Sequence, residues 1–161
     1  MSEIVHHQFA PIYDTESKIL ILGTIPSPKS REQGFYYGHP RNRFWKVLSD
    51  ILIEPMPATI EDKITMVKKH HIALWDVLAS CEIQGADDAS IKNPIPNDMD
   101  IILKRARIQR IYTTGSKATA LYKKYCYPET GILSVMLPST SPANCRMQYE
   151  QLKQEYSRII T

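Results

Sequence analysis

Residues 18–45 read K-I-L-I-L-G-T-I-P-S-P-K-S-R-E-Q-G-F-Y-Y-G-H-P-R-N-R-F-W, and this stretch decides how the rest of the chain is interpreted. It opens with an apolar run that ends in glycine, which is typical of a buried parallel strand. An amphipathic helix is expected from about Arg41. The loop between them, 24–40, is long for a compact domain, and long ordered loops are usually functional. In an open α/β sheet, ligands bind where such loops leave the carboxyl ends of the strands.

Part of this loop, 23–30, is close to the G-x-x-x-x-G-K-[ST] loop that holds nucleotide phosphates. Pro28 takes the place of the second glycine. A proline has a fixed φ and no backbone N–H to donate to a phosphate. No helical pattern begins at Lys29 either, because Glu32-Gln33-Gly34 interrupts it. The sequence therefore argues against a nucleotide-triphosphate site.

The rest of the chain alternates between strand and helix patterns. Phe44, Val47, Leu48 and Ile51 recur at helical spacing and should face the core. The predicted strands are 18–23, 72–78, 108–114 and 131–136, and the predicted helices are 41–53, 59–70, 98–106, 115–125 and 146–159. We expect Asn97 to cap the helix over 98–106. Residues 1–17 are predicted to be a lead-in, and 79–97 to be a second long loop.

Strands that alternate with helices at these lengths predict an α/β fold, here one domain spanning 1–161. We expect a three-layer α/β/α sandwich with a central four-stranded parallel sheet and right-handed crossovers. A chain of 161 residues that is 43% hydrophobic can bury a core of its own. The loops after the first and fourth strands leave the same edge of the sheet. They should therefore converge on one site.

The charge distribution says more than the net charge of +3, which alone does not indicate a nucleic-acid partner. The basic residues around the first loop are Lys29, Arg31, Arg41, Arg43 and Lys46, and only Glu32 opposes them. Such a cluster suits a phosphate backbone, although an ordinary solvated helix face is the alternative. The pair His6-His7 has no carboxylate or cysteine at ligand spacing, so we expect a surface or lightly packed role and not a metal site.

Two motifs resemble a known family. The segment 38–47, G-H-P-R-N-R-F-W-K-V, closely resembles H-P-x-N-R-F-W-K-V of the mismatch-specific uracil-DNA glycosylases. With L-P-S-T-S-P-A-N at 137–144, the chain from about 5 to 160 resembles the uracil-DNA glycosylase superfamily, in particular its DNA-deoxyinosine (hypoxanthine-DNA) glycosylase branch. The segments A-L-W-D-V-L-A-S-C-E at 73–82 and N-P-I-P-N at 93–97 fit the same pattern. The resemblance implies an enzyme that flips a deaminated base out of DNA and hydrolyses its N-glycosidic bond.

The resemblance implies that Asn42 is the catalytic residue. Relatives carry an Asp or Asn two residues after the glycine of the first motif, where this chain has Ile25, which cannot orient a water. The amide of Asn42 is no general base, but its carbonyl oxygen can hold a water. The alternative is that Asn42 merely caps the helix over 41–53. Asp88 leaves a similar choice, since it aligns with an Asp of the family while Asp commonly serves turns.

For the base, the resemblance implies a stacking platform and a polar lining. Tyr37 aligns with the aromatic on which relatives stack the flipped base. His39 is a candidate for polarising the base, with a structural role as the alternative, whereas Phe35, Phe44 and Trp45 are expected in the core. The family's usual N-G is Thr114-Gly115 here, so an Asn contact is absent. The predicted base-binding residues are Thr24, Ile25, Pro26, Ser27, Tyr37, His39 and Gly115.

The second motif is implied to meet the DNA. Leu137 replaces the usual histidine of the superfamily, so backbone donors would have to stabilise the departing base. Ser139 and Ser141 suit phosphate contacts near the start of the last helix. The segment after them resembles the wedge that fills the vacated stack. The predicted DNA-binding residues are Lys29, Arg41, Arg43, Ser139, Thr140, Ser141, Pro142, Ala143, Asn144 and Arg146.

We expect no metal or organic cofactor. Some relatives carry a four-cysteine iron–sulfur cluster, which the three cysteines Cys81, Cys126 and Cys145 cannot build. No lysine is placed for strand cleavage through a Schiff base, so a monofunctional enzyme is expected. No signal peptide or membrane-length apolar run is present, so we expect a cytoplasmic protein, or a nuclear one in a eukaryote. We also expect a monomer whose partner is damaged double- or single-stranded DNA. The alternatives are a G:U/G:T mismatch-specific uracil/thymine glycosylase and a non-catalytic DNA-binding domain of the same fold.

Overall fold

A central parallel sheet organises the computed structural model, which describes residues 2–7 and 9–160. The strands of this sheet are β2 (Ile19–Gly23), β3 (Ile72–Asp76), β6 (Arg110–Thr114) and β7 (Ser134–Leu137). They lie in the order β3-β2-β6-β7. The prediction of four parallel strands is confirmed. The chain builds outward from β2 on one side and then on the other, so the strand order reverses between β2 and β6. In open α/β sheets, ligands bind at the carboxyl ends of the strands at such a point, and we call this place the crevice.

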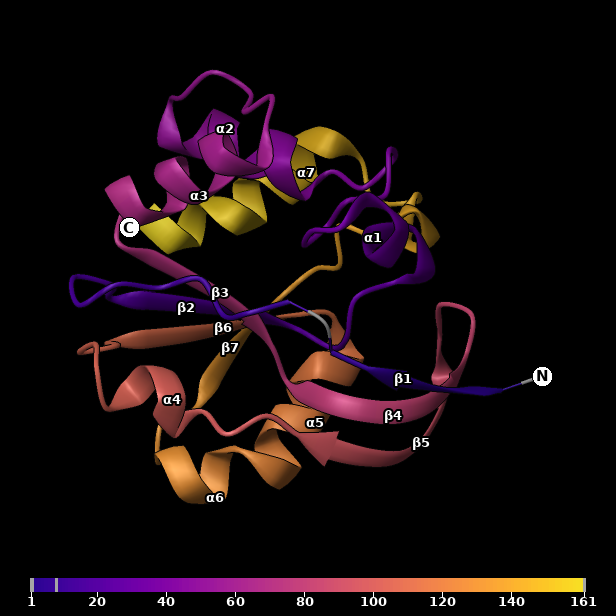
Figure 1. Ribbon diagram of the computed structural model, residues 1–161. Helices are drawn as coiled ribbons and strands as arrows, with labels where there is room; N and C mark the ends of the chain where they lie inside the picture. Colours follow the sequence, from indigo (N-terminus) through magenta and orange to yellow (C-terminus); the bar gives the residue numbers. More distant parts are fainter. Residues whose placement is uncertain (1, 8, 161) are drawn as a thin grey trace.

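Helices cover both faces of this sheet (Figure 1). On one face lie α2 (Phe44–Leu52), α3 (Ile60–Lys69) and α7 (Tyr149–Tyr156), and on the other lie α4 (Asp100–Leu103), α5 (Ser116–Tyr125) and α6 (Tyr127–Thr130). The four apolar residues predicted to face the core from α2 are all buried. The three-layer sandwich is therefore confirmed. None of the helices in the described part of the chain combines the length and apolarity that crossing a membrane requires.

A second, antiparallel sheet adjoins the first and was not predicted. It consists of β1 (Glu3–His6), β4 (Leu78–Gln84) and β5 (Asp87–Pro96), in the order β1-β4-β5. The predictions of a lead-in over 1–17 and a loop over 79–97 were wrong. Register shifts interrupt the pairing of β4 with β5, so the hairpin lacks the strict alternation by which a sequence reveals strands.

Two predictions about helix starts were also wrong. A short helix, α1 (Pro28–Gln33), forms in the first loop, because Ser27 Oγ accepts from Ser30 N at 3.2 Å and proline suits the first helical position. Asn97 caps no helix. Its side-chain amide donates instead to the carbonyls of Asp76 (2.9 Å) and Leu78 (3.1 Å).

Candidate active site

The loops that follow β2 and β7 are joined at the carboxyl edge of the sheet. Arg43 N donates to Thr140 O at 3.1 Å. The Arg43 guanidinium donates to Met147 O at 2.7 Å and to Asn144 O at 3.0 Å. The predicted convergence of the two motifs is therefore confirmed. The guanidinium cross-links the two loops, and the predicted contact of Arg43 with DNA stays a prediction.

The loop after β6 completes this edge. Gly115 N donates to Leu137 O at 2.7 Å. A Cβ built on Gly115 would lie 3.6 Å from Ser139 Cβ, and the φ of Gly115 is +88°, where L side chains are strained. The contact at 3.6 Å would be ordinary, so the left-handed backbone is the reason that glycine suits this position. Thr140 is 2% exposed, which places its side chain inside this junction, and its contact with DNA stays a prediction.

The first loop is held rigid from within. The buried Ser30 accepts a hydrogen bond from Gly38 N at 3.0 Å and another from Ser27 Oγ at 3.2 Å. Thr24 O accepts from Leu78 N at 3.1 Å, which fixes the start of the loop to β4. Pro26 is buried and Ile25 packs partly against the core. The backbone of 24–27 is thus a fixed wall at the crevice.

Asn42 stands at the head of α2, half-buried. Its Oδ1 accepts from Phe44 N at 2.9 Å, so the capping role that the sequence left open is real. One carbonyl oxygen has two lone pairs, and the second remains able to accept from a water. Next to it, Arg41 N donates to His39 Nδ1 at 3.0 Å. In the neutral imidazole this contact leaves the proton of His39 on Nε2.

Tyr37 forms the other side of the site. Its ring stacks on Phe44, with centroids 3.8 Å apart and planes 13° apart. Its φ of 54° lies in the left-handed region, which is uncommon for an aromatic residue. The hydroxyl is buried and has no hydrogen-bond partner among the described residues. Burial and the negative charge of Asp76 both raise the pKa of Tyr37, so the hydroxyl keeps its proton.

Comparison with known proteins agrees with this geometry. The model of the uracil DNA glycosylase superfamily matches residues 10–160. The chain belongs to the uracil DNA glycosylase superfamily. A protein of Methanosarcina barkeri named hypoxanthine DNA glycosylase is 31% identical over 139 residues, covering 86% of this chain and 87% of the relative. A protein of Methanosarcina acetivorans with the same name is 28% identical over 144 residues, covering 89% of this chain and 90% of its own length.

A solved structure is similar to this chain over almost its whole length. It is a solution NMR structure of a Methanosarcina acetivorans protein, provisionally assigned as a uracil DNA glycosylase. It superposes with a TM-score of 0.81 at 27% identity, covering 99% of this chain and all of the other. The fold class expected from the sequence is therefore confirmed at the level of the superfamily.

The three aromatic residues predicted to lie in the core, Phe35, Phe44 and Trp45, are buried. Tyr36 is buried with them. Trp45 Nε1 donates to Tyr36 O at 2.9 Å, and Tyr36 itself donates to Ala10 O at 2.9 Å. These aromatics form the floor beneath the loop and leave Tyr37 as the aromatic that reaches the crevice.

The second superfamily motif presents polar groups on a short turn, η1 (Pro142–Asn144). Ser139 Oγ accepts from Ser141 N at 3.1 Å, and Ser141 Oγ accepts from Ala143 N at 3.2 Å. Both hydroxyl protons remain able to donate to a phosphate. The Asn144 amide donates to Ser139 O at 2.9 Å and so stabilises the turn. Ala143 is exposed at its tip.

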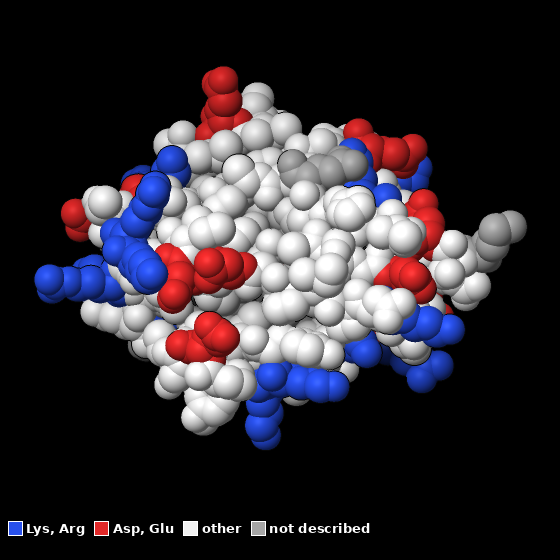
Figure 2. Space-filling model, turned by 60° about the horizontal axis from the view of Figure 1, so that its bottom comes forward, with Lys and Arg blue, Asp and Glu red and all other residues white. Residues whose placement is uncertain are grey.

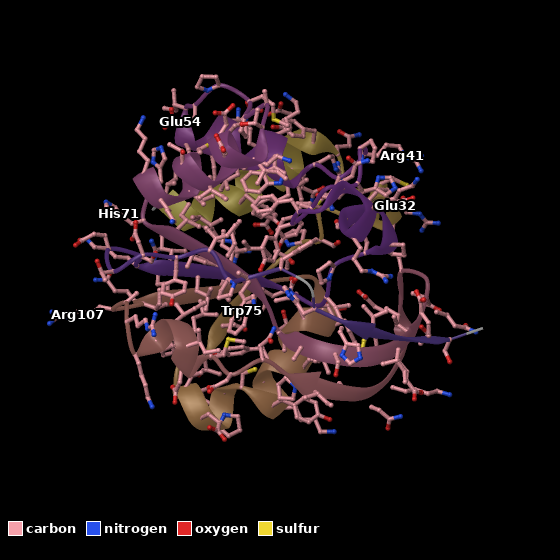
Figure 3. The ribbon with its side chains drawn as sticks, viewed as in Figure 1. Glu32, Arg41, Glu54, His71, Trp75 and Arg107 are labelled. Atoms are coloured by element: carbon pink, nitrogen blue, oxygen red, sulfur yellow. The ribbon has the colours of Figure 1, made fainter. Side chains whose placement is uncertain are left out.

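Three basic residues predicted to meet DNA are exposed. Lys29 pairs with Glu32, with 3.1 Å between Nζ and Oε2, and Arg41 and Arg146 project to solvent. Arg41 and Glu32 lie at the end of the molecule that carries α1, whereas His71 and Arg107 lie at the opposite end (Figure 3). On the face in Figure 2, charged groups stand around a largely uncharged centre. Basic groups gather at the left of this view, with acidic groups beside them.

Sequence reasoning missed a buried hydrogen bond beside the crevice. His7 Nε2 lies 2.7 Å from Asp76 Oδ2, and the two side chains are only 4% and 6% exposed. The prediction of a surface or lightly packed role was wrong for His7. Asp76 had a usable signal, since it is the single polar residue at the end of the apolar strand β3. His7 had none, because its pairing depends on how β1 folds back. Asp88, by contrast, is exposed on β5.

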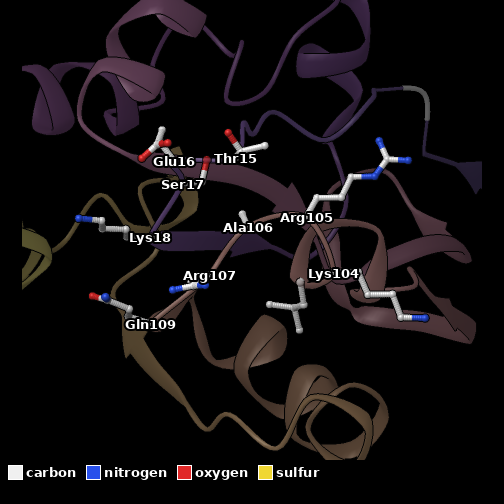
Figure 4. Close-up of a pocket in the computed structure, with 10 residues that line it drawn as sticks. Thr15, Glu16, Ser17, Lys18, Lys104, Arg105, Ala106, Arg107 and Gln109 are labelled. Atoms are coloured by element: carbon white, nitrogen blue, oxygen red, sulfur yellow. The ribbon is translucent and has the colours of Figure 1, made fainter.

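A cavity of about 570 Å³ lies away from this site (Figure 4). Its lining includes Lys18, Lys104, Arg105 and Gln109, at the edge where β2 and β6 begin. It therefore belongs to the amino edge of the sheet, not to the crevice. Within residues 2–7 and 9–160, no group of three or more His, Cys, Asp or Glu is placed to hold a metal ion.

Proposed function

We propose that this protein is a monofunctional DNA glycosylase that removes hypoxanthine, with uracil as a second substrate, and leaves an abasic site. Membership of the superfamily and two relatives named hypoxanthine DNA glycosylase support the reaction class. The observation that carries the proposal is the link between Arg43 N and Thr140 O. It supports the proposal because it joins the loop that carries Tyr37 and Asn42 to the second motif.

Substrate entry begins with extrusion of the damaged nucleotide. Flipping costs a few kcal/mol and is least costly for a mispaired base. The face of Tyr37 turned away from Phe44 receives the base, and stacking on an aromatic contributes about 1–3 kcal/mol. The exposed turn around Ala143 fills the space left in the duplex. Ser139, Ser141 and the guanidinium of Arg41 contact the phosphates on either side.

The bond from C1′ of deoxyribose to the base nitrogen then breaks, with both electrons leaving on the base. Asn42 Oδ1 holds the attacking water with the lone pair not used by Phe44 N. The water oxygen bonds to C1′ and gives up one proton, so the products are the free protonated base and an abasic sugar. The Nε2–H of His39 and backbone N–H groups stabilise the negative charge that develops on the base.

The choice of base follows from its edge. Hypoxanthine and uracil both present a carbonyl beside a ring N–H, where adenine and cytosine present an amino group. The fixed backbone of 24–27 supplies donors and acceptors for that pattern. Uracil is the second candidate because the matching family takes its name from it. We further propose that the protein acts as a monomer, inside the cell, where its DNA substrate is.

The test uses end-labelled duplexes that carry one deoxyinosine or one deoxyuridine, incubated with the protein in EDTA. Heating in alkali should then cleave the strand at the damaged site, and omitting the alkali should leave it intact. An undamaged duplex is the control, and varying the opposite base measures preference. If neither duplex is cleaved, the protein is not a glycosylase for these bases, and the alternative is a non-catalytic DNA-binding domain. Cleavage without alkali would contradict monofunctional action.

A further inference from the structure

The buried pair His7–Asp76 lies at the end of β3, close to the hydroxyl of Tyr37. Asp76 ends β3 and pairs in register with Gly23, the last residue of β2. A Cβ built on Gly23 would stand 2.5 Å from Asp76 Oδ1 and 3.3 Å from the Tyr37 hydroxyl. The carboxylate and the hydroxyl therefore border the same small space, which only a glycine leaves open.

Hydrogen bonding fixes the direction of the His7–Asp76 contact. Phe9 N donates to His7 Nδ1 at 3.2 Å, so in the neutral ring the proton is on Nε2 and is donated to Asp76 Oδ2. The imidazole is held in place by Phe9 and Tyr36, whose ring centroids lie 5.9 and 5.8 Å away. The hydrogen bond on Oδ2 limits the rotation of the carboxylate, and Oδ1 is the oxygen that borders the space beside Gly23.

The Tyr37 hydroxyl needs a partner that the resting structure does not give it. It is buried and makes no hydrogen bond of ordinary geometry among the described residues, and such a group carries a free-energy penalty. Two oxygens border the same space, Asp76 Oδ1 and the Thr114 hydroxyl. Asp76 Oδ1 is the charged acceptor on its side of the space. The backbone of Tyr37 is also held at a φ of 54°, so the ring depends on its surroundings to stay in position.

We propose that His7 and Asp76 are positioning residues for base excision: His7 orients the Asp76 carboxylate, and the carboxylate accepts from the Tyr37 hydroxyl and holds the ring against the flipped base. This inference rests on the proposed function, because it assumes that Tyr37 is the stacking platform. It assigns the first strand of the chain a part in a site otherwise built from the loops of the parallel sheet.

The test compares single-turnover excision by four variants: His7→Leu, His7→Gln, Tyr37→Phe and the double variant His7→Leu/Tyr37→Phe. Glutamine keeps an N–H donor for Asp76, whereas leucine keeps only the bulk. We expect His7→Leu and Tyr37→Phe each to slow excision about tenfold, because small misplacements of a bound group are costly. The double variant should be no slower than Tyr37→Phe alone, and His7→Gln should recover most of the rate. His6→Leu, on the exposed neighbour, is the matched control.

Tyrosine-selective NMR of the free protein gives a readout that does not depend on activity. The Tyr37 ring resonances should shift in His7→Leu and not in His6→Leu. Equal rates in His7→Leu and the wild type, multiplied losses in the double variant, or a mere fall in unfolding temperature at unchanged rate would each overturn this inference alone. A wild-type protein that excises neither base would overturn the proposed function, and this inference with it.

Discussion

At the scale of the residue, Asn42 has two tasks that compete for one oxygen. Its Oδ1 caps α2 through Phe44 N and, in the proposed mechanism, also holds the attacking water. The cap fixes the rotamer of the side chain, so the same contact that stabilises the helix aims the second lone pair. Replacing Asn42 with a residue that lacks the carbonyl should therefore lower both the stability of the protein and the rate of excision. The two effects have to be measured separately.

Replacing Asn42 with alanine should slow excision about 100-fold, the usual scale for losing a group that positions a reacting water. Loss of the cap should also lower the free energy of unfolding by about 1 kcal/mol. Single-turnover rates well below the unfolding temperature, combined with urea denaturation, separate the effects. Thr59→Ala is the matched control, because Thr59 Oγ1 caps α3 through Asp62 N at 3.0 Å, remote from the crevice. If both variants lose stability alone, Asn42 is only a cap.

At the scale of the element, the site depends on how loops and helices are tied together. Arg43 connects the start of α2 to the second motif through three hydrogen bonds, one from its backbone and two from its guanidinium. Its neighbour Arg41 makes no such link and is exposed. The side chain of Arg43 therefore stabilises the fold, whereas the side chain of Arg41 is free to contact DNA.

Arg43→Ala should lower the free energy of unfolding by roughly 1.5–3 kcal/mol, because two carbonyls lose a charged donor. Arg41→Ala should leave stability unchanged, weaken DNA binding, and reduce the dependence of log affinity on log salt by about one. Urea denaturation and DNA binding at several salt concentrations measure both quantities. The reverse assignment of the two effects would show that Arg43 is the phosphate contact.

Glu54 ties the end of α2 to the end of α3. Its Oε2 lies 2.9 Å from Lys69 Nζ and 2.6 Å from His70 Nε2. Hydrogen bonds from Lys69 and then from His70 lower the pKa of Glu54. A lowered carboxyl pKa means stability that is present above the unfolded value of about 4.3 and is lost as pH falls through the native value. The unfolding temperature of Glu54→Gln should therefore depend less on pH below about 5 than that of the wild type, and calorimetry would show whether the two curves converge in acid.

At the scale of the whole molecule, the three cysteines differ in their exposure to solvent. Cys81 and Cys126 are buried, whereas Cys145 is exposed beside the η1 turn. Burial raises the pKa of the Cys126 thiol to about 11 and also raises that of Cys81. Both therefore stay protonated and unreactive near neutral pH.

Iodoacetamide at neutral pH should alkylate Cys145 alone in the folded protein and all three cysteines after denaturation. Bound duplex with a non-cleavable deoxyinosine analogue should slow the labelling of Cys145, because the predicted wedge lies beside it. Mass spectrometry of tryptic peptides gives the extent at each cysteine. Equal labelling of Cys145 with and without DNA would place the bound duplex away from this turn.

The parts that could be predicted are those with a local or periodic signal. The four parallel strands are apolar runs, and the face of α2 repeats at helical spacing, so both were found. The junction at the crevice followed from topology, because both motifs come after strands of one sheet. The β4–β5 hairpin was missed because register shifts conceal its alternation. The contact of His7 with Asp76 was missed because only tertiary folding brings residues this far apart in sequence together.

The placement of the two ends of the described chain has a practical consequence. β1 lies at the end of the molecule that carries α1 and the crevice, whereas η2 (Ser157–Ile160) lies toward the other end (Figure 1). A purification tag or fluorescent fusion joined ahead of β1 would crowd the approach of a duplex and pull on the strand that leads into His7. Attachment beyond η2 leaves that approach clear, and immobilising the protein through this end orients it for surface-based binding measurements.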